Sequence, residues 1–242
     1  MTVSFHKFGP RKDEPLQPFF PGTGDIADVG ALNGRGYSVN VPLKDGTSDE
    51  TFHSLFKPIM TRIMEVFRPS SIVLQCGADS LAHDRLGCFN LSLKGHGEAV
   101  RFIKSFNVPM LVTGGGGYTK KNVARCWTYE TSILTDSPVS EHLPKTAYWE
   151  YFSPDHSIDV PPQRDREEFS KDDNTRADID KIKKEVFESL RQLACAPSVQ
   201  MHEVPSDMRT PRFEAVTCDQ APLEERLGLY GRQHNFWPVP PM

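Results

Sequence analysis

The sequence has few of the features that mark membrane, secreted or redox proteins. No apolar run reaches the roughly 18–20 residues needed to cross a bilayer. The first residues, MTVSFHKFG, have neither the basic region nor the apolar stretch of a signal peptide. The five cysteines, which include no C-x-x-C pair, are Cys76, Cys88, Cys126, Cys195 and Cys218. We therefore expect reduced thiols of the nucleus or cytosol rather than a disulfide framework or a zinc ribbon.

The chain also lacks an excess of positive charge. The 242 residues carry a formal net charge of −4, so the chain as a whole is not a basic nucleic-acid binder. We expect neither direct DNA binding nor membrane binding. With 38% hydrophobic and 25% charged residues, the composition is that of an ordinary globular protein, and the length suits one domain with or without a tail.

What the sequence does contain is an alternation of short apolar runs and longer amphipathic runs. Residues 2–5 resemble a strand, and residues 71–76 and 109–113 are predicted to be buried strands, the first with the apolar, β-branched character of a buried parallel strand. Helical spacing of apolar residues predicts helices at 50–66, 96–106, 120–134 and 178–194. This alternation favours an α/β protein, with a parallel sheet and helices on both of its faces.

Two details qualify the first predicted helix. Thr47 and Glu50 have the spacing of a capping box, which predicts the start of the helix. Pro58 lacks a backbone donor and is expected to split or kink it. After Pro205 the periodicity fades, which predicts a tail of low order.

Two unusual segments follow predicted strands. Asp79 lies in CGADS after the strand that ends at Cys76, and Tyr118 closes GGGGY after the next strand. Ligands of open parallel sheets bind beyond the carboxyl ends of the strands. If the strands are neighbours, a carboxylate able to hold a metal and a phenol able to stabilise an oxyanion face the same crevice.

Plainer interpretations remain open on these patterns. An aspartate after a strand is more often a helix N-cap, and a tyrosine after glycines is more often a packing residue, so both roles stand for Asp79 and Tyr118. The glycine run is no P-loop, because no Gly-Lys-Ser/Thr follows it. His83 and His96 lie near the crevice, but no two histidines are spaced i, i+4 as in a helical zinc site. Surface or loop roles are expected for both.

Longer motifs resemble a known family. LQCGADSLAHDRLGCFNLSLKGH, followed by GGGGYTKKNVARCWTYET, strongly resembles the class I zinc-dependent histone deacetylases. SFHKFG, FFPGTGD, NVPLKDG and APSVQM match the same family in the same order. The resemblance implies a partial deacetylase catalytic domain at 1–205 and a poorly ordered tail at 206–242. It also implies a three-layer α/β/α fold of the arginase/deacetylase type, with a central, mostly parallel sheet that is incomplete here.

The resemblance assigns roles position by position. It makes Asp79 a zinc ligand and Tyr118 the phenol that hydrogen-bonds the acetyl carbonyl. Phe20 and Leu86 match the walls of the tunnel around the acetyl-lysine side chain. Ser4, Phe5 and Tyr37 match positions that bind potassium. Arg85 and Lys121 match positions that contact an inositol phosphate, although the family usually has arginine at the position of Lys121.

The family reaction is zinc-assisted hydrolysis of an acetylated lysine. The resemblance implies that an Asp-x-His segment, a histidine pair and central strands belong upstream of Ser4, but this sequence holds neither motif. We therefore expect a truncated chain that neither binds zinc tightly nor deacetylates, with a sheet edge left open. The segment from Pro10 to about Phe19 resembles an insertion, which affects the register of Phe20. His83 stands where the family usually has a glycine or another small residue.

The expected setting is transcriptional repression and chromatin regulation in the nucleus, with the cytoplasm as a second location. Histone tails are the implied substrate, and corepressor subunits and inositol phosphate are the implied partners. One alternative is a non-catalytic module that binds corepressor and inositol phosphate through Arg85 and Lys121. Another is a deacetylase of small acetylated amines, which share the metal site; the class I motifs and Leu86 favour protein lysine.

Overall fold

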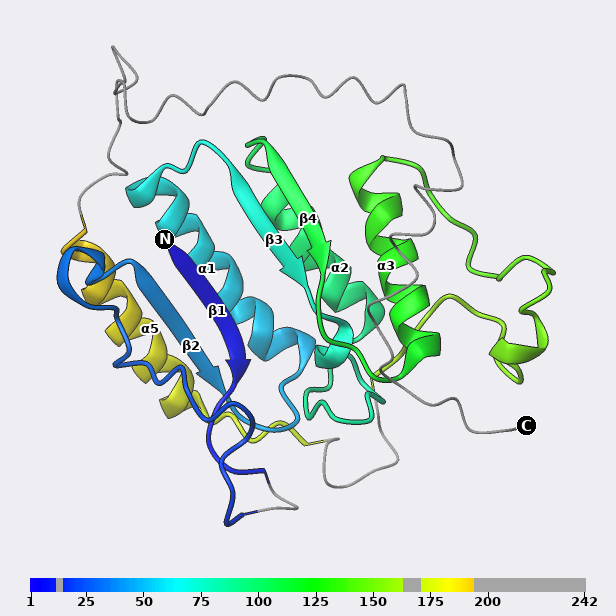
Figure 1. The fold of residues 1–242 in the computed structure, drawn as a ribbon, viewed down its shortest axis with the longest axis horizontal. Helices are drawn as coiled ribbons and strands as arrows, with labels where there is room; N and C mark the ends of the chain where they lie inside the picture. The colour runs from blue at the N-terminus through cyan, green and yellow to red at the C-terminus, as the bar shows by residue number, and fades with distance from the viewer. Residues whose placement is uncertain (12–14, 163–170, 194–242) are drawn as a thin grey trace, which may run out of the picture. The chain divides into compact units, whose positions relative to one another are not determined.

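The computed structural model describes residues 1–11, 15–162 and 171–193 (Figure 1). Its strands are β1 (Thr2–Lys7), β2 (Ser38–Leu43), β3 (Ile72–Cys76) and β4 (Met110–Gly114). Its helices are α1 (Asp49–Phe67), α2 (Leu93–Lys104), α3 (Lys120–Leu134) and α5 (Arg176–Arg191), with short 3-10 turns η1 (Leu32–Gly34), η2 (Ala78–Ser80) and η3 (Glu150–Phe152). The tail predicted at 206–242, the APSVQM segment, Cys195 and Cys218 lie outside the described residues.

The predicted α/β character is confirmed, and every strand pairing is parallel. β1 pairs with β2 from Thr2↔Ser38 to Lys7↔Leu43, and β3 pairs with β4 from Ile72↔Met110 to Cys76↔Gly114. All four strands point the same way in Figure 1. Among the described residues they form two separate two-stranded sheets rather than one central sheet, because β1 and β3 do not pair with each other.

Strand β2 was not predicted from periodicity, and Pro42 lies within it. The carbonyls of Tyr37 and Leu43 accept hydrogen bonds from Thr2 and Phe8, so the odd-numbered residues of β2 face β1. Backbone groups alternate in direction along a strand, which turns the nitrogen of Pro42 to the outer edge. Its missing N–H therefore costs no hydrogen bond of the ladder.

Helix α1 runs unbroken through Pro58, so the expected split is wrong. Its N-cap is Ser48, whose hydroxyl accepts a hydrogen bond from the Thr51 backbone, so the predicted Thr47 cap is one residue early. The lost hydrogen bond at Pro58 is offset by burial of one whole face of the helix. That face consists of Phe52, Leu55, Phe56, Ile59 and Ile63.

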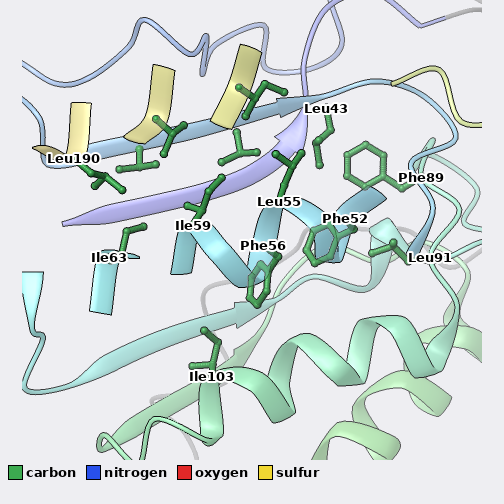
Figure 2. Packing of buried hydrophobic residues seen from close by; sticks show 14 of the residues in the cluster. Leu43, Phe52, Leu55, Phe56, Ile59, Ile63, Phe89, Leu91, Ile103 and Leu190 are labelled. Carbon is green, nitrogen blue, oxygen red and sulfur yellow. The ribbon is translucent and has the colours of Figure 1, made fainter. Parts of the chain in front are cut away.

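The main core lies between α1 and both strand pairs (Figure 2). The ring of Phe5 on β1 lies 5.5 Å from that of Phe52 and 5.0 Å from that of Phe56. On the other side of the core, Ile72 and Leu74 of β3 pack against the same cluster. Packing against helix α1 therefore determines the positions of both strand pairs.

In the described part of the chain, the core packs on one face of the β3–β4 pair. Ile72, Leu74 and Met110 pack against the core, whereas Val73 is 71% exposed and Leu111 is 61% exposed on the opposite face. The expectation of helices on both faces is thus not met for this pair within the described residues. None of the described helices is both long and apolar enough to span a membrane.

Candidate active site

A cavity of about 740 Å³ opens at the carboxyl ends of β1 and β3. The four residues that the family resemblance assigns to the zinc, the acetyl carbonyl and the tunnel line it together: Phe20, Asp79, Leu86 and Tyr118. Phe20 lies in the connection after β1, Asp79 and Leu86 lie in the connection between β3 and α2, and Tyr118 follows β4. The parallel strands bring these connections to the same edge. The crevice predicted from the two strand-end segments is therefore present.

Asp79 lies within the turn η2 that directly follows β3. The N-cap of this turn is Gly77, and no side chain caps it, so Asp79 is not the helix cap that the local pattern favoured. Burial is the main cause that raises the pKa of Asp79, and the nearby charge of Asp84 raises it further, against a hydrogen bond from its own backbone N–H. The carboxylate is thus a poorly solvated group that a positive charge would stabilise.

Gly116, in the glycine run after β4, packs directly on the Asp79 carboxylate. A Cβ atom at position 116 would collide with the Oδ2 and Cγ atoms of that carboxylate. The backbone N–H of Ala78 donates to the Gly116 carbonyl over 2.7 Å, which ties the two loops together. A glycine is required here because only a bare backbone leaves room for the acid.

Asp84 holds the loops that carry Leu86 and Tyr118. One of its carboxylate oxygens accepts hydrogen bonds from the backbone of Leu86 at 2.9 Å and of Gly87 at 2.8 Å. The other accepts from the backbone of Tyr118 at 2.8 Å and of Thr119 at 3.2 Å. The sequence reasoning did not single out this residue, although an aspartate that precedes a loop glycine by three residues, as Asp84 precedes Gly87, is a common turn signal.

Tyr118 is 44% exposed and lines the cavity, so it is not simply a buried packing residue. The amide hydrogen bonds from Tyr118 and Thr119 to Asp84 fix its backbone on the side of the cavity that also carries Leu86. A phenol held in this way can donate a hydrogen bond to an oxygen in the cavity.

A buried ion pair supports the strand end beneath Asp79. His96 of α2 lies within the core, which corrects the expected surface role, while His83 is exposed as expected. Nδ1 of His96 lies 2.6 Å from a Glu130 carboxylate oxygen, and Nε2 of His96 lies 3.0 Å from the Gly77 carbonyl oxygen. Trp127 adds a second support by donating to the Cys76 carbonyl over 2.9 Å.

The comparisons with known proteins agree with this arrangement. Residues 1–134, more than half of the chain, match the model of the histone deacetylase domain. The chain belongs to the histone deacetylase family. It is 52% identical to Histone deacetylase 9 of Arabidopsis thaliana over 214 residues, which cover 88% of this chain and 47% of the relative.

Two further relatives show the same proportions. Identity to Histone deacetylase 1 of Homo sapiens is 52% over 207 residues, covering 86% of this chain and 40% of the relative. Identity to Histone deacetylase 1 of Oryza sativa is 51% over 226 residues, covering 93% of this chain and 40% of the relative. The chain thus spans less than half the length of each of these histone deacetylases, and its resemblance to the class I members is confirmed.

The remaining residues assigned by the family resemblance lie in different places. Ser4 and Phe5 line the cavity, and the Ser4 hydroxyl donates to His6 Nδ1 over 2.7 Å. Tyr37 is not among the lining residues; its carbonyl accepts a hydrogen bond from Thr2 at the start of β1. The three predicted potassium positions are therefore not brought together around this cavity.

Arg85 and Lys121 also lie outside the cavity lining. Arg85 is exposed. The Lys121 ammonium donates to the Ser153 carbonyl over 3.2 Å and lies 5.3 Å from the centre of the Tyr151 ring. An inositol phosphate would compete with these contacts for Lys121.

The family is zinc-dependent, but the described residues do not fit a catalytic zinc at Asp79. Such a site needs three protein ligands, and across residues 1–11, 15–162 and 171–193 only one group of three candidate ligands occurs, His96, Cys126 and Glu130. It does not include Asp79. Ligand atoms around a tetrahedral zinc lie roughly 3.3 Å apart. The 2.6 Å between His96 and Glu130 is instead that of a hydrogen bond.

The expected reduced thiols are confirmed for the described cysteines. Cys76, Cys88 and Cys126 are buried and free. Burial raises the pKa of Cys76 to about 12, with the Glu130 charge as the second cause. These thiols are therefore structural rather than nucleophilic.

Proposed function

We propose that this chain carries the substrate-binding half of a protein deacetylase that hydrolyses the acetyl amide of N6-acetyl-lysine. The observation that supports it best is the common cavity of Phe20, Asp79, Leu86 and Tyr118. The proposed fold is the three-layer arrangement of the arginase/deacetylase type. The exposed apolar Val73 and Leu111 support it, since a further layer would cover them.

In this proposal each residue has a limited task. Phe20, 87% exposed, and Leu86, 46% exposed, present apolar surface that the methylene chain of a lysine can cover. The Tyr118 phenol donates a hydrogen bond to the acetyl oxygen as negative charge develops on it. Asp79 supplies one carboxylate at the same end of the cavity.

We further propose that the 242-residue chain is inactive by itself, because one carboxylate cannot hold a catalytic zinc. The purified chain should contain far less than one zinc per chain after dialysis, and it should not hydrolyse an acetyl-lysine peptide. Near-stoichiometric zinc would show that other residues complete the site.

A chimera tests the hydrolytic role directly. This chain would replace the matched region of Histone deacetylase 9 of Arabidopsis thaliana, which the alignment covers over 214 residues. The chimera should deacetylate an acetyl-lysine peptide, and Tyr118→Phe should lower kcat by about 100-fold, as loss of an oxyanion donor does. Activity that survives Tyr118→Phe unchanged would refute the assigned role.

Histone tails as substrate, corepressor subunits as partners, and a nuclear location are part of the same proposal. They are supported by the identity of the relatives, which are named histone deacetylases. A purely non-catalytic module that binds inositol phosphate is less well supported, since Lys121 is already engaged by Ser153 and Tyr151.

A further inference from the structure

The segment from Pro10 to about Phe19, which resembles an insertion in the family pattern, forms part of the candidate cavity. Its lining residues are Arg11, Gln17, Pro18 and Phe19. The described part of this segment lies beyond the arrowhead of β1 in Figure 1. Because the segment separates the motifs HKFG and FFPGTGD, these side chains give the cavity a wall that the family resemblance does not account for.

Hydrogen bonds hold both ends of this segment in place. Pro10 and Pro18 lie opposite each other in an isolated antiparallel bridge, and the Phe19 N–H donates to the Gly9 carbonyl over 3.1 Å. The Lys7 ammonium donates to the Pro10 carbonyl over 2.8 Å. The segment therefore starts and ends at fixed positions beside the cavity.

Arg11 attaches this segment to the wall that carries Leu86. Its guanidinium donates to the Leu86 carbonyl over 3.0 Å. A guanidinium has five N–H donors in a planar fork, so this bond does not prevent it from binding a further acceptor. Leu86 contributes apolar surface to the proposed path of the acetyl-lysine side chain, so the guanidinium lies beside that path.

The positive charge of Arg11 acts on the cavity wall. Among the described lining residues, Lys7, Arg11 and Asp79 are the ones with an ammonium, guanidinium or carboxylate group. The Lys7 ammonium is paired with Asp45, whose carboxylate lies 2.9 Å away in a buried contact. Burial is the main cause that raises the pKa of Cys88, another lining residue, and the charge of Arg11 opposes that rise. Other groups of the cavity therefore experience this cation.

We propose that Arg11 is a specificity-determining residue of the proposed deacetylase, selecting peptides that have a carboxylate side chain next to the acetyl-lysine. This inference rests on the proposed function, because the peptide must place its acetyl-lysine in the cavity. Adjacent residues of a peptide have Cα atoms about 3.8 Å apart, so the neighbour of the acetyl-lysine remains close to Leu86 and to the guanidinium bonded to it. A carboxylate can accept two parallel hydrogen bonds from a guanidinium.

The other lining residues of the segment would not produce this preference. Gln17, Pro18 and Phe19 are uncharged, so they would accept neutral neighbours of the acetyl-lysine as readily as acidic ones. Among the described residues of the segment, only Arg11 carries a charge. The preference for a carboxylate should therefore depend on this one side chain.

The test uses the chimera in which this chain replaces the matched region of Histone deacetylase 9 of Arabidopsis thaliana. Two peptides are compared, with glutamate or with glutamine on both sides of the acetyl-lysine. The glutamate peptide should have a KM about threefold lower at equal kcat, as expected of an ion pair open to solvent. Arg11→Gln should abolish the difference, and Arg11→Lys should keep part of it because the charge remains.

Arg35→Gln is the matched control, because Arg35 is exposed and lies outside the cavity lining. It should leave the ratio of the two KM values unchanged. Both peptides are measured on the same sample of each variant, so a loss of folded protein would not alter the ratio. Equal KM values in the unsubstituted chimera, or a difference that persists in Arg11→Gln, would overturn the inference.

Fluorescence anisotropy of the labelled peptides separates this inference from the proposed function, because binding needs no hydrolysis. A chimera that binds the glutamate peptide about threefold more tightly but hydrolyses neither peptide would refute the proposed hydrolysis and support the role of Arg11. Hydrolysis of both peptides with equal affinity would support the proposed function and refute the role of Arg11. Absence of binding to either peptide would refute both.

Discussion

His96 and Glu130 form a buried ion pair, with Nδ1 of the imidazole 2.6 Å from a carboxylate oxygen and side-chain exposures of 11% and 4%. The second ring nitrogen lies 3.0 Å from the Gly77 carbonyl, which can only accept a hydrogen bond. An ionised Glu130 likewise only accepts, so both ring nitrogens donate and His96 is an imidazolium. The pair connects α2 and α3 to the segment that carries Asp79.

Removing the negative partner should destabilise the protein strongly. Glu130→Gln leaves the His96 charge buried without its counter-ion, and we expect a loss of about 3 kcal/mol in the free energy of unfolding. Denaturant titration measures it. The control is Glu188→Gln, which breaks an exposed pair with Arg191 and should change the free energy by less than about 0.5 kcal/mol. Equal effects of the two substitutions would contradict the ion pair.

The same pair predicts how stability depends on pH. Burial by itself lowers the pKa of His96, but hydrogen bonds with Cys126 and Glu130 outweigh it and raise the pKa well above its ordinary value of 6.5. The folded chain thus holds this proton more tightly than the unfolded chain. The stabilisation is complete below pH 6.5 and is lost as the pH rises through the folded pKa.

Unfolding free energies measured between about pH 7 and pH 8.5 should therefore fall as the pH rises. Three other groups near His96 have shifted pKa values, and they change stability outside this pH range. The pKa of Asp79 is raised from 3.8, and the pKa values of Cys76 and Cys126 are raised from 9.0. Burial is the main cause that lowers the pKa of His53, so the titration of His53 changes stability only below pH 6.5. A flat profile across the window would contradict a protonated His96.

Asp84→Ala should loosen both loops that frame the cavity. The substitution removes the hydrogen-bond acceptor of four backbone N–H groups, those of Leu86, Gly87, Tyr118 and Thr119. We expect a loss of about 2 kcal/mol, in line with charged hydrogen bonds, and faster amide exchange at Tyr118 and Thr119. Asp25→Ala, which removes one exposed hydrogen bond to Ala27, is the control and should leave those amides unchanged.

Gly116→Ala should disturb the site while leaving the rest of the fold in place. The added methyl group collides with the Asp79 carboxylate, so one of the two loops must move. We expect a destabilisation of about 1–3 kcal/mol and chemical-shift changes centred on 77–80 and 114–118. Gly34→Ala is the control, since no atom lies within 4 Å of a Cβ placed there. Shift changes spread evenly over the chain would argue against this local clash.

Much of the fold followed from local patterns. Helix α3 was predicted with its observed bounds, and three of the four strands were found within two residues at each end. β2 was missed although Val39, Val41 and Leu43 alternate as in a half-buried strand. Pro42 argues against a strand in the sequence, and the pairing with β1 shows that it is one. The expected break at Pro58 was wrong because burial of the α1 face outweighs one lost hydrogen bond.

For the site, the sequence by itself determined that Asp79 and Tyr118 each follow the end of a strand. The parallel pairing of β3 with β4 brings both residues to one edge of the sheet. Only the tertiary structure decided that Asp84 fastens their loops and that His96 is buried against Glu130, because these contacts join residues 34 positions apart. The separation of β1 from β3 was also decided only by the tertiary structure. It results from one helix, α1, packing against two strand pairs that do not bond to each other.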